Sequence, residues 1–116
     1  MKLAAIRKFA MGLPDVTEEP HFDMTSFRVR GKIFVTAPPD GAHVHVFVDD
    51  VLRGPALAAH PEFIEKLLWG GNVRGLRIAL ADANLKVVQD LVRAAWEEKN
   101  NTKSSRAKGA KSAKKK

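Results

Sequence analysis

The sequence predicts an α+β fold, a two-layer domain in which an antiparallel sheet of about four strands packs against N- and C-terminal helices. Apolar residues recur at helical spacing near both ends of the domain and alternate with polar residues in its middle. Short turns with glycine or proline join the alternating segments, which favours antiparallel neighbours. We therefore expect the terminal helices to cover one face of the sheet.

Length and composition indicate one small domain followed by a basic tail. The chain has 116 residues and 45% apolar content, which is enough for one modest core. Residues 1–100 are electrically neutral, with 13 basic and 13 acidic side chains, so the net charge of +7 comes from residues 101–116. That segment has no apolar side chain larger than alanine and cannot offset its ordering entropy. We predict a domain over 1–100 and a disordered lysine-rich tail over 101–116.

The composition also limits where in the cell the protein is expected to function. The absence of cysteine excludes disulfides and thiolate metal sites, and no apolar run approaches the roughly 18 to 20 residues that span a bilayer. Arg7 and Lys8 interrupt the apolar part of residues 1–14, unlike the core of a signal peptide. We expect a cytoplasmic protein that has no membrane partner, with a monomer favoured.

The first two segments are predicted to be a helix and a loop. Residues 3–13 place apolar side chains on one stripe, and Pro14 ends the run. The following PDVTEEPHFDM, residues 14–24, is acidic, has two prolines and shows no sustained period. It therefore predicts a loop across the surface.

Residues 26–37 predict a hairpin of two half-buried strands, because apolar and polar residues alternate in both arms. A two-residue turn at Arg30-Gly31 would pair Val29 with Lys32, whereas a turn one residue longer would pair Val29 with Ile33. The longer turn keeps one face of the hairpin apolar, so we expect it.

The middle of the chain predicts a third strand and two short helices. The Pro-Pro-Asp-Gly turn at 38–41 leads into AHVHVFV, residues 42–48, whose valines face one way and whose histidines and phenylalanine face the other. A short helix follows near Pro55. A second helix is predicted to begin at Pro61 and to end at Gly70-Gly71.

The last part of the domain predicts a fourth strand and a long helix. Residues 73–80 alternate in the pattern of a strand, and Asp82 is a plausible N-cap for a helix with a continuous apolar stripe. Trp69 and Trp96 occupy stripe positions of the two predicted helices, so we expect both in the core or at its edge.

Three segments of the sequence resemble the MmcQ/YjbR family. They are E-x-P-H-F from Glu18 followed by SFRVRGKIF, then the PPDG turn with its valine strand, and the helix LADANLKVVQDLVRAAWE. The resemblance covers roughly residues 3–97 and implies a compact α+β domain of the frataxin (CyaY-like) kind. It also implies DNA binding, because the family is similar to double-wing proteins with paired hairpins. Leu76 stands where the family often has tryptophan.

The tail suggests binding to nucleic acid without sequence preference. Its seven cations can replace counterions on a polyanion with little geometric demand; the alternative is a solvated tail that only improves solubility. These cations are Lys103, Arg106, Lys108, Lys111, Lys114, Lys115 and Lys116.

The hairpin offers a second set of cations, within residues 26–41. Arg28, Arg30 and Lys32 would line its outward face and contact phosphates, with Phe34 available to stack or wedge. The alternative is an ordinary charged face that keeps the sheet soluble, with its cations neutralised by the acidic residues at 18 and 19.

A rival hypothesis is a protein- or small-ligand-binding module with an inert tail. Its site would be the sheet face around His43, His45 and Phe47, or the loop that holds His21. A concave pocket lined by His21 and Trp69, together with Arg28, would favour this hypothesis.

The histidines and acidic residues of the sequence also raise the hypotheses of a metal site and of an acid/base group. His43 and His45 lie on one strand face, where His21 could add a third ligand, but a half-exposed face explains the same pattern. Glu18 and Glu19 could form an acid/base group with His21, although no partnered nucleophile accompanies them. We expect no metal, no cofactor and no enzymatic activity.

Overall fold

The structure is a computed structural model in which residues 1–101 are described. The predicted tail beyond Asn101 lies outside these residues. The helices are α1 (Leu3–Met11), α2 (Asp50–Ala59) and α3 (Leu85–Asn100), and the strands are β1 (Val16–His21), β2 (Met24–Val29), β3 (Lys32–Ala37), β4 (His43–Val46), β5 (Ile64–Trp69) and β6 (Asn72–Ala79).

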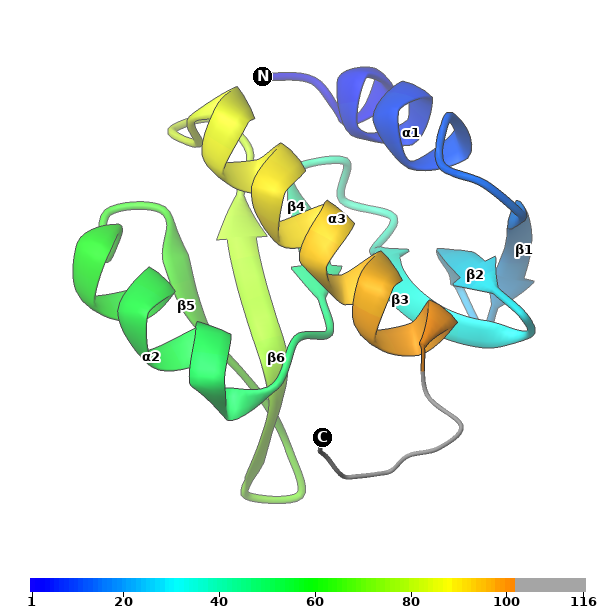
Figure 1. Cartoon of the computed structure of the whole chain (residues 1–116). Helices are drawn as coiled ribbons and strands as arrows, with labels where there is room; N and C mark the ends of the chain where they lie inside the picture. The colour runs from blue at the N-terminus through cyan, green and yellow to red at the C-terminus, as the bar shows by residue number, and fades with distance from the viewer. Residues whose placement is uncertain (102–116) are drawn as a thin grey trace.

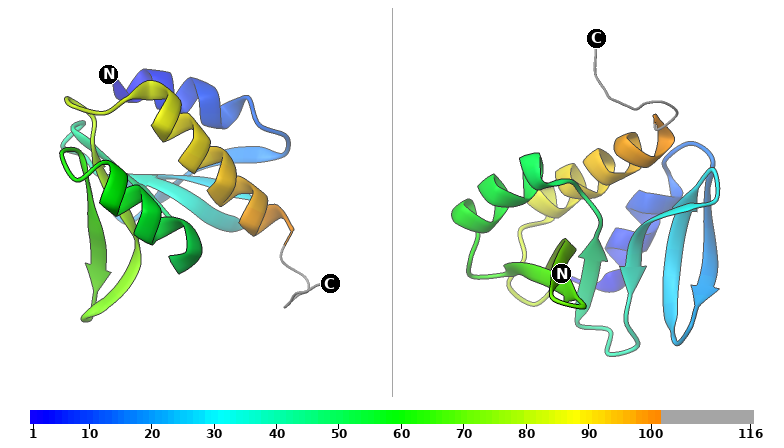
Figure 2. Two further views of the ribbon diagram at one scale, coloured as in Figure 1. Left: turned by 60° about the vertical axis from the view of Figure 1, so that its left-hand side comes forward. Right: turned by 90° about the horizontal axis from the view of Figure 1, so that it is seen from below.

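All six strands form one antiparallel sheet in the order β1-β2-β3-β4-β6-β5. Figures 1 and 2 show α1, α2 and α3 on one face of this sheet. Within residues 1–101 the opposite face carries no helix, and we call it the uncovered face. The α+β prediction is confirmed, whereas the expected number of about four strands is wrong.

The first missing strand is β1, which was predicted as part of a loop. Its residues pair along their whole length with β2, from Val16 opposite Val29 to His21 opposite Met24. β1 is an edge strand whose central residues are exposed on both faces. Its sequence therefore lacks the alternation of apolar and polar residues that would identify it as a strand. Pro20 fits here because an edge strand has one side that makes no ladder hydrogen bonds.

The second missing strand is β5, which was predicted as a helix. Its register shifts between Leu67 and Leu68, where a bulge interrupts the pairing with β6. Ile64 and Leu67 are both buried, and because they lie three residues apart their burial imitates the spacing of a helix, although the pairing with β6 is regular from Ile64 to Leu67. Gly70 and Gly71 both have positive φ values and form the tight turn to β6 instead of ending a helix.

The β2–β3 hairpin combines features of both expected registers. Val29 pairs with Lys32 across a two-residue turn, and both turn residues, Arg30 and Gly31, have positive φ values, as a type I′ turn requires. The prediction of a longer turn is therefore wrong. A bulge in the pairing between β2 and β3 nevertheless brings Phe27 opposite Val35, so the apolar face is kept.

The core lies between the helices and the covered face of the sheet. Its largest buried side chains include Phe27, Phe34, Ile6, Leu76 and Ile78. The α3 stripe contributes Val88, Leu91, Val92 and Ala95, as predicted, although the side chain of Asn84 and not that of Asp82 caps the helix by accepting from the Val87 N–H at 3.1 Å. No helix within residues 1–101 has the length and apolar character needed to cross a bilayer.

Candidate functional site

The uncovered face of the sheet contains a hollow of about 470 Å³. Its walls combine two aromatic rings, an imidazole, an aliphatic side chain, a hydroxyl and two cations, with no carboxylate among them. We call it the sheet hollow, and its lining residues are His21, Ile33, Thr36, Phe47, Trp69, Arg74 and Lys99.

Strand alternation explains why these side chains reach the uncovered face. Val35 and Val46 pair across β3 and β4 and are fully buried in the core. The next pair, Thr36 with His45, must therefore point the other way. Phe47, two residues after His45, lies on the same face as His45. The alternation of valines with histidines and phenylalanine in the sequence predicted this arrangement.

The two aromatic rings of the sheet hollow are held by close backbone contacts. A Cβ atom placed on Gly75 would lie 2.5 Å from the Val46 carbonyl oxygen and 3.3 Å from the Phe47 ring, so the absence of a side chain there lets Phe47 pack against β6. The ring of Trp69 lies 6.1 Å from that of Phe47, at an angle of 52°. Trp69 is 44% exposed, which contradicts its expected place in the core, while Trp96 is partly buried against the core as predicted.

The β2–β3 hairpin tip adjoins the C-terminal end of α3. The Nε atom of Arg30 donates to the Asn100 side-chain oxygen at 2.8 Å. Asn100 follows Lys99, which lines the sheet hollow. The hairpin tip, the sheet hollow and the start of the basic tail are thus neighbours in space.

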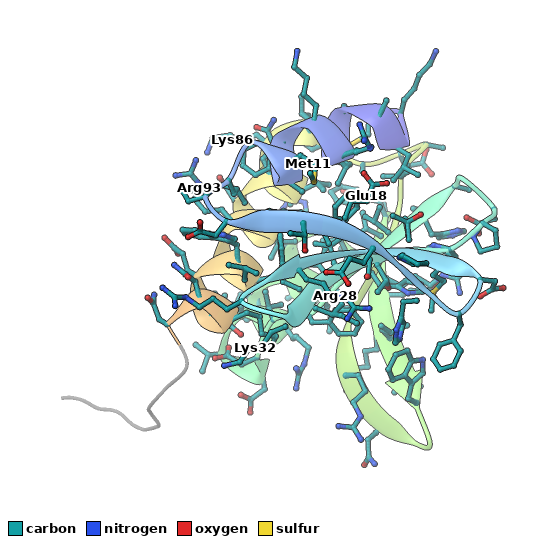
Figure 3. The ribbon with its side chains drawn as sticks, turned by 90° about the vertical axis from the view of Figure 1, so that its right-hand side faces the viewer. Met11, Glu18, Arg28, Lys32, Lys86 and Arg93 are labelled. Carbon is teal, nitrogen blue, oxygen red and sulfur yellow. The ribbon has the colours of Figure 1, made fainter. Side chains whose placement is uncertain are left out.

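Both hairpin arginines are bonded to neutral acceptors. Arg28 donates to the Ser26 hydroxyl at 3.0 Å and to the Pro20 carbonyl at 3.3 Å, and Arg30 donates to an amide oxygen. Glu18, which we considered as a neutralising partner, instead lies 2.6 Å from Arg7 of α1. Figure 3 shows Glu18 on the α1 side of β1 and Arg28 on the opposite side.

Phe34 does not belong to this surface. The sequence placed it on the outward face of the hairpin, but its side chain is 0% exposed. It is the extra residue of the bulge, between Ile33, which pairs with Arg28, and Val35, which pairs with Phe27, so the alternation of faces is broken there. Phe34 is therefore a core residue and cannot stack on or wedge into a ligand.

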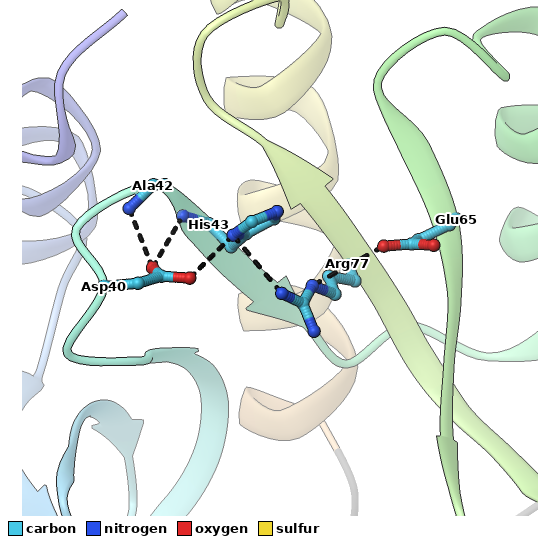
Figure 4. A network of polar contacts seen from close by, with 5 residues as sticks. All are labelled: Asp40, Ala42, His43, Glu65 and Arg77. Atoms are coloured by element: carbon cyan, nitrogen blue, oxygen red, sulfur yellow. Dashed lines mark hydrogen bonds and ion pairs between the residues drawn. The ribbon is translucent and has the colours of Figure 1, made fainter.

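His43 lies in a polar network on the uncovered face, shown in Figure 4. Asp40 accepts from the backbone N–H groups of Ala42 and His43 at 2.8 and 3.2 Å, and its pKa is lowered by these bonds and by its bond to the imidazole. The imidazole Nδ1 lies 2.8 Å from Asp40 Oδ2, and because a carboxylate only accepts, this nitrogen carries a proton. The approach of Arg77 Nη2 at 3.4 Å is then a contact and not a hydrogen bond.

His45 is buried beside this network. Its Nδ1 atom lies 3.2 Å from the Thr36 hydroxyl, while its Nε2 atom has no partner among residues 1–101. Burial lowers the pKa of His45, and the nearby positive charge of Arg77 lowers it further. The imidazole is consequently neutral at pH 7.

The depressed pKa of His45 predicts that acid destabilises the fold. In the unfolded chain this imidazole titrates near its ordinary pKa of about 6.5, so the unfolded state binds more protons as the pH falls through that value. Stability should be full above this pH and decline below it. Unfolding free energies from urea titrations at pH 7.5 and 5.5 should differ less for His45→Gln than for the wild type; equal differences would contradict the prediction.

His21, His43 and His45, which the sequence suggested as possible metal ligands, do not come together in one site. His21 lines the sheet hollow, whereas the ring nitrogens of His43 and His45 engage Asp40 and Thr36. Within residues 1–101 no group of three potential ligand side chains could hold a metal ion. Of the two carboxylates considered beside His21, Glu18 pairs with Arg7 and Glu19 accepts from the Thr17 hydroxyl.

The structure brings some predicted residues together and adds others. His21 and Phe47 share the sheet hollow, and Trp69 joins them, but Arg28 is not part of its lining. Sequence reasoning missed the contributions of Arg74 and Lys99. The tail cations from Lys103 to Lys116 lie outside the described residues.

The fold and the site define a small α+β protein with helices on one face of a six-stranded antiparallel sheet and a cationic, aromatic hollow on the other. The sequence profile of the YjbR family matches residues 11–98. The chain therefore belongs to the YjbR family, which confirms the resemblance noted in the sequence.

A solved structure shares this fold. The crystal structure of Deinococcus radiodurans protein DR2400, assigned to domain family DUF419, matches with a TM-score of 0.77 and 15% sequence identity, over 90% of this chain and 83% of that chain. At this identity the likeness concerns the fold alone. No curated protein matches the chain.

Proposed function

We propose that the protein is a non-enzymatic, nucleic-acid-binding protein without sequence preference, in which the basic tail supplies most of the affinity and the β2–β3 hairpin assists. The observation that carries the proposal is the 2.8 Å hydrogen bond between Arg30 and Asn100. This bond places the tip of the hairpin beside Asn100, the last residue before the tail. A polyanion bound to the tail would therefore reach the hairpin cations.

The charges of the hairpin support the same function. Arg28 and Arg30 are each bonded to neutral oxygen atoms, and no carboxylate within residues 1–101 forms an ion pair with either. Their guanidinium charges therefore remain uncompensated by a direct partner, which favours phosphate contact.

The finer fold expected from the family, a frataxin (CyaY-like) domain with a double wing, is part of this proposal. The hairpins β2–β3 and β5–β6 both end in two-residue turns with positive φ values. Ile33 of the first hairpin and Trp69 of the second both line the sheet hollow, so we assign these hairpins as the two wings. We place the protein in the cytoplasm and expect it to bind as a monomer.

The experiment is a fluorescence anisotropy titration of a labelled DNA duplex with the full-length protein at low salt. The double variant Arg28→Gln/Arg30→Gln should bind any sequence more weakly, and the slope of log affinity against log salt should become shallower by about 2. Absence of binding by the wild type at low salt would contradict the function.

A matched control removes two cations from the helical side of the molecule. Lys86 and Arg93 of α3 are labelled in Figure 3, away from the side on which Arg28 lies. The variant Lys86→Gln/Arg93→Gln has the same net charge as the hairpin variant, and its salt slope should match that of the wild type. If both variants lose affinity equally, the hairpin is not the contact surface.

The rival function is binding of a small ligand in the sheet hollow, with an inert tail. It is favoured by one observation, that His21, Phe47 and Trp69 line a single concavity. This alternative predicts no DNA binding by the intact chain, and a rise of Tm with a small ligand because only the folded state would bind it.

A further inference from the structure

The sheet hollow has a composition that suits a planar, negatively charged ligand. Phe47 and Trp69 present their rings at 52° to one another, with centroids 6.1 Å apart, so they are not stacked on each other. Arg74 and Lys99 add positive charge to the same lining. Aromatic faces beside cations are the features with which proteins hold a nucleobase and its phosphate.

The exposure of Trp69 is unusual for so large an apolar side chain. It is 44% exposed and sits immediately before the Gly70-Gly71 turn, where its backbone pairs with Asn72. The tight turn fixes the backbone at Trp69, so little backbone entropy is lost when a base stacks on the ring. An exposed indole beside a concavity is a ready stacking surface.

A second exposed ring lies close to the sheet hollow. The ring of Phe22 packs edge-on against His21, with centroids 4.7 Å apart, and is 89% exposed. Its φ value of 59° follows from its place in the two-residue turn between His21 and Met24, which pair across β1 and β2. This ring extends the aromatic surface beyond the wall formed by His21.

Duplex DNA cannot use such a concavity, because its bases are stacked inside the helix with their faces covered. An unpaired base can turn its face to the protein. From these observations, and resting on the proposed function, we infer that the sheet hollow binds an unpaired base of a single-stranded nucleic acid whose backbone is held by the tail and the hairpin. The continuity from Arg30 through Asn100 to Lys99 provides one cationic path for that strand.

The test compares three probes with the full-length protein: an oligothymidylate single strand, the duplex of the same length, and thymidine monophosphate. Trp69→Ala should lower the affinity for the single strand at least about fivefold, because a lost base stack has that effect. The affinity for the duplex should stay unchanged. Trp69→Phe keeps an aromatic face and should retain most of the affinity for the single strand.

Leu68→Ala is the matched control, because Leu68 is the neighbouring residue in β5, is 55% exposed and does not line the sheet hollow. It should change neither affinity. An equal loss on single strand and duplex with Trp69→Ala, or no loss, would overturn the inference. Displacement of the single strand by thymidine monophosphate at equal concentration would also overturn it, since the ligand would then be a free nucleotide.

The same titrations separate this inference from the proposed function. If the wild type binds neither nucleic acid, the proposed function fails. If it binds both with a steep salt dependence and Trp69→Ala has no effect, nucleic-acid binding stands and only the assignment of the sheet hollow fails.

Discussion

Replacing the seven basic tail residues with glutamine should remove most of the affinity of the full-length protein for duplex DNA. Those residues account for the whole net charge of +7. If all seven release counterions, the wild-type slope of log affinity against log salt is about −6 from the tail alone. Between about 50 and 200 mM salt, the wild-type affinity should then fall on the order of 10³- to 10⁴-fold.

The neutral-tail variant should keep only the shallow salt dependence that Arg28 and Arg30 supply, a slope of about −2. The measurement is the same anisotropy titration at several salt concentrations. Exchanging the seven cations for one another, lysine for arginine, provides a control that preserves charge and should preserve the slope. A neutral-tail variant with the wild-type slope would show that the tail is inert.

Phe34→Ala should cost about 3 to 5 kcal/mol of unfolding free energy. The side chain is fully buried in the core cluster between the helices and the sheet, so its truncation would leave a cavity there. Because small domains have only about 5 to 15 kcal/mol of stability, the variant should be largely destabilised. Urea denaturation measures the loss.

Phe22→Ala is the matched control for this prediction, since it removes the same ring from a position that is 89% exposed. Its cost should stay within about 0.5 kcal/mol. Similar losses for Phe22→Ala and Phe34→Ala would mean that Phe34 is not the core residue described here.

The parts of the fold with regular periodicity were predictable from the sequence. The α3 stripe is formed by a continuous 3.6-residue repeat, and the alternation of Val44, His45 and Val46 correctly separated the two faces of β4. In both elements local pattern and tertiary packing agree, so the sequence alone is sufficient.

The errors have two physical causes. β1 lies at the edge of the sheet and is mostly exposed, so it lacks the alternation that identifies a strand. β5 lacks it too, because its buried residues Ile64 and Leu67 lie three apart, and Trp69 was therefore assigned to a helical stripe. In β3 the register with β2 shifts at Phe34, and this bulge changes the face that Phe34 occupies. The Gly70-Gly71 pair between two apolar runs was the signal that could have identified the second hairpin.

The sheet hollow was predictable only in part, because it joins residues that are distant in sequence: His21, Phe47 and Trp69 were candidates, whereas Arg28 is not in the lining and Arg74 and Lys99 were missed. Its lining comes from β1, β3, the end of β4, both strands of the β5–β6 hairpin and the end of α3. The pairing order β3-β4-β6-β5 brings Thr36, Phe47 and Trp69 to one place. That order depends on a crossover through α2 and β5 that no local pattern encodes.

The most direct test of a nucleic-acid surface on the uncovered face is an NMR titration of the ¹⁵N-labelled full-length protein with an oligothymidylate strand. The chain has two tryptophans, and they report on different places: Trp69 lines the sheet hollow, while the indole N–H of Trp96 donates to the Pro14 carbonyl at 3.0 Å. We expect the Trp69 indole signal to shift together with the amides of Arg30 and Phe47, and the Trp96 indole signal to stay in place. Binding that leaves the Trp69 signal unmoved, or moves only residues on the helical side, would contradict the assignment.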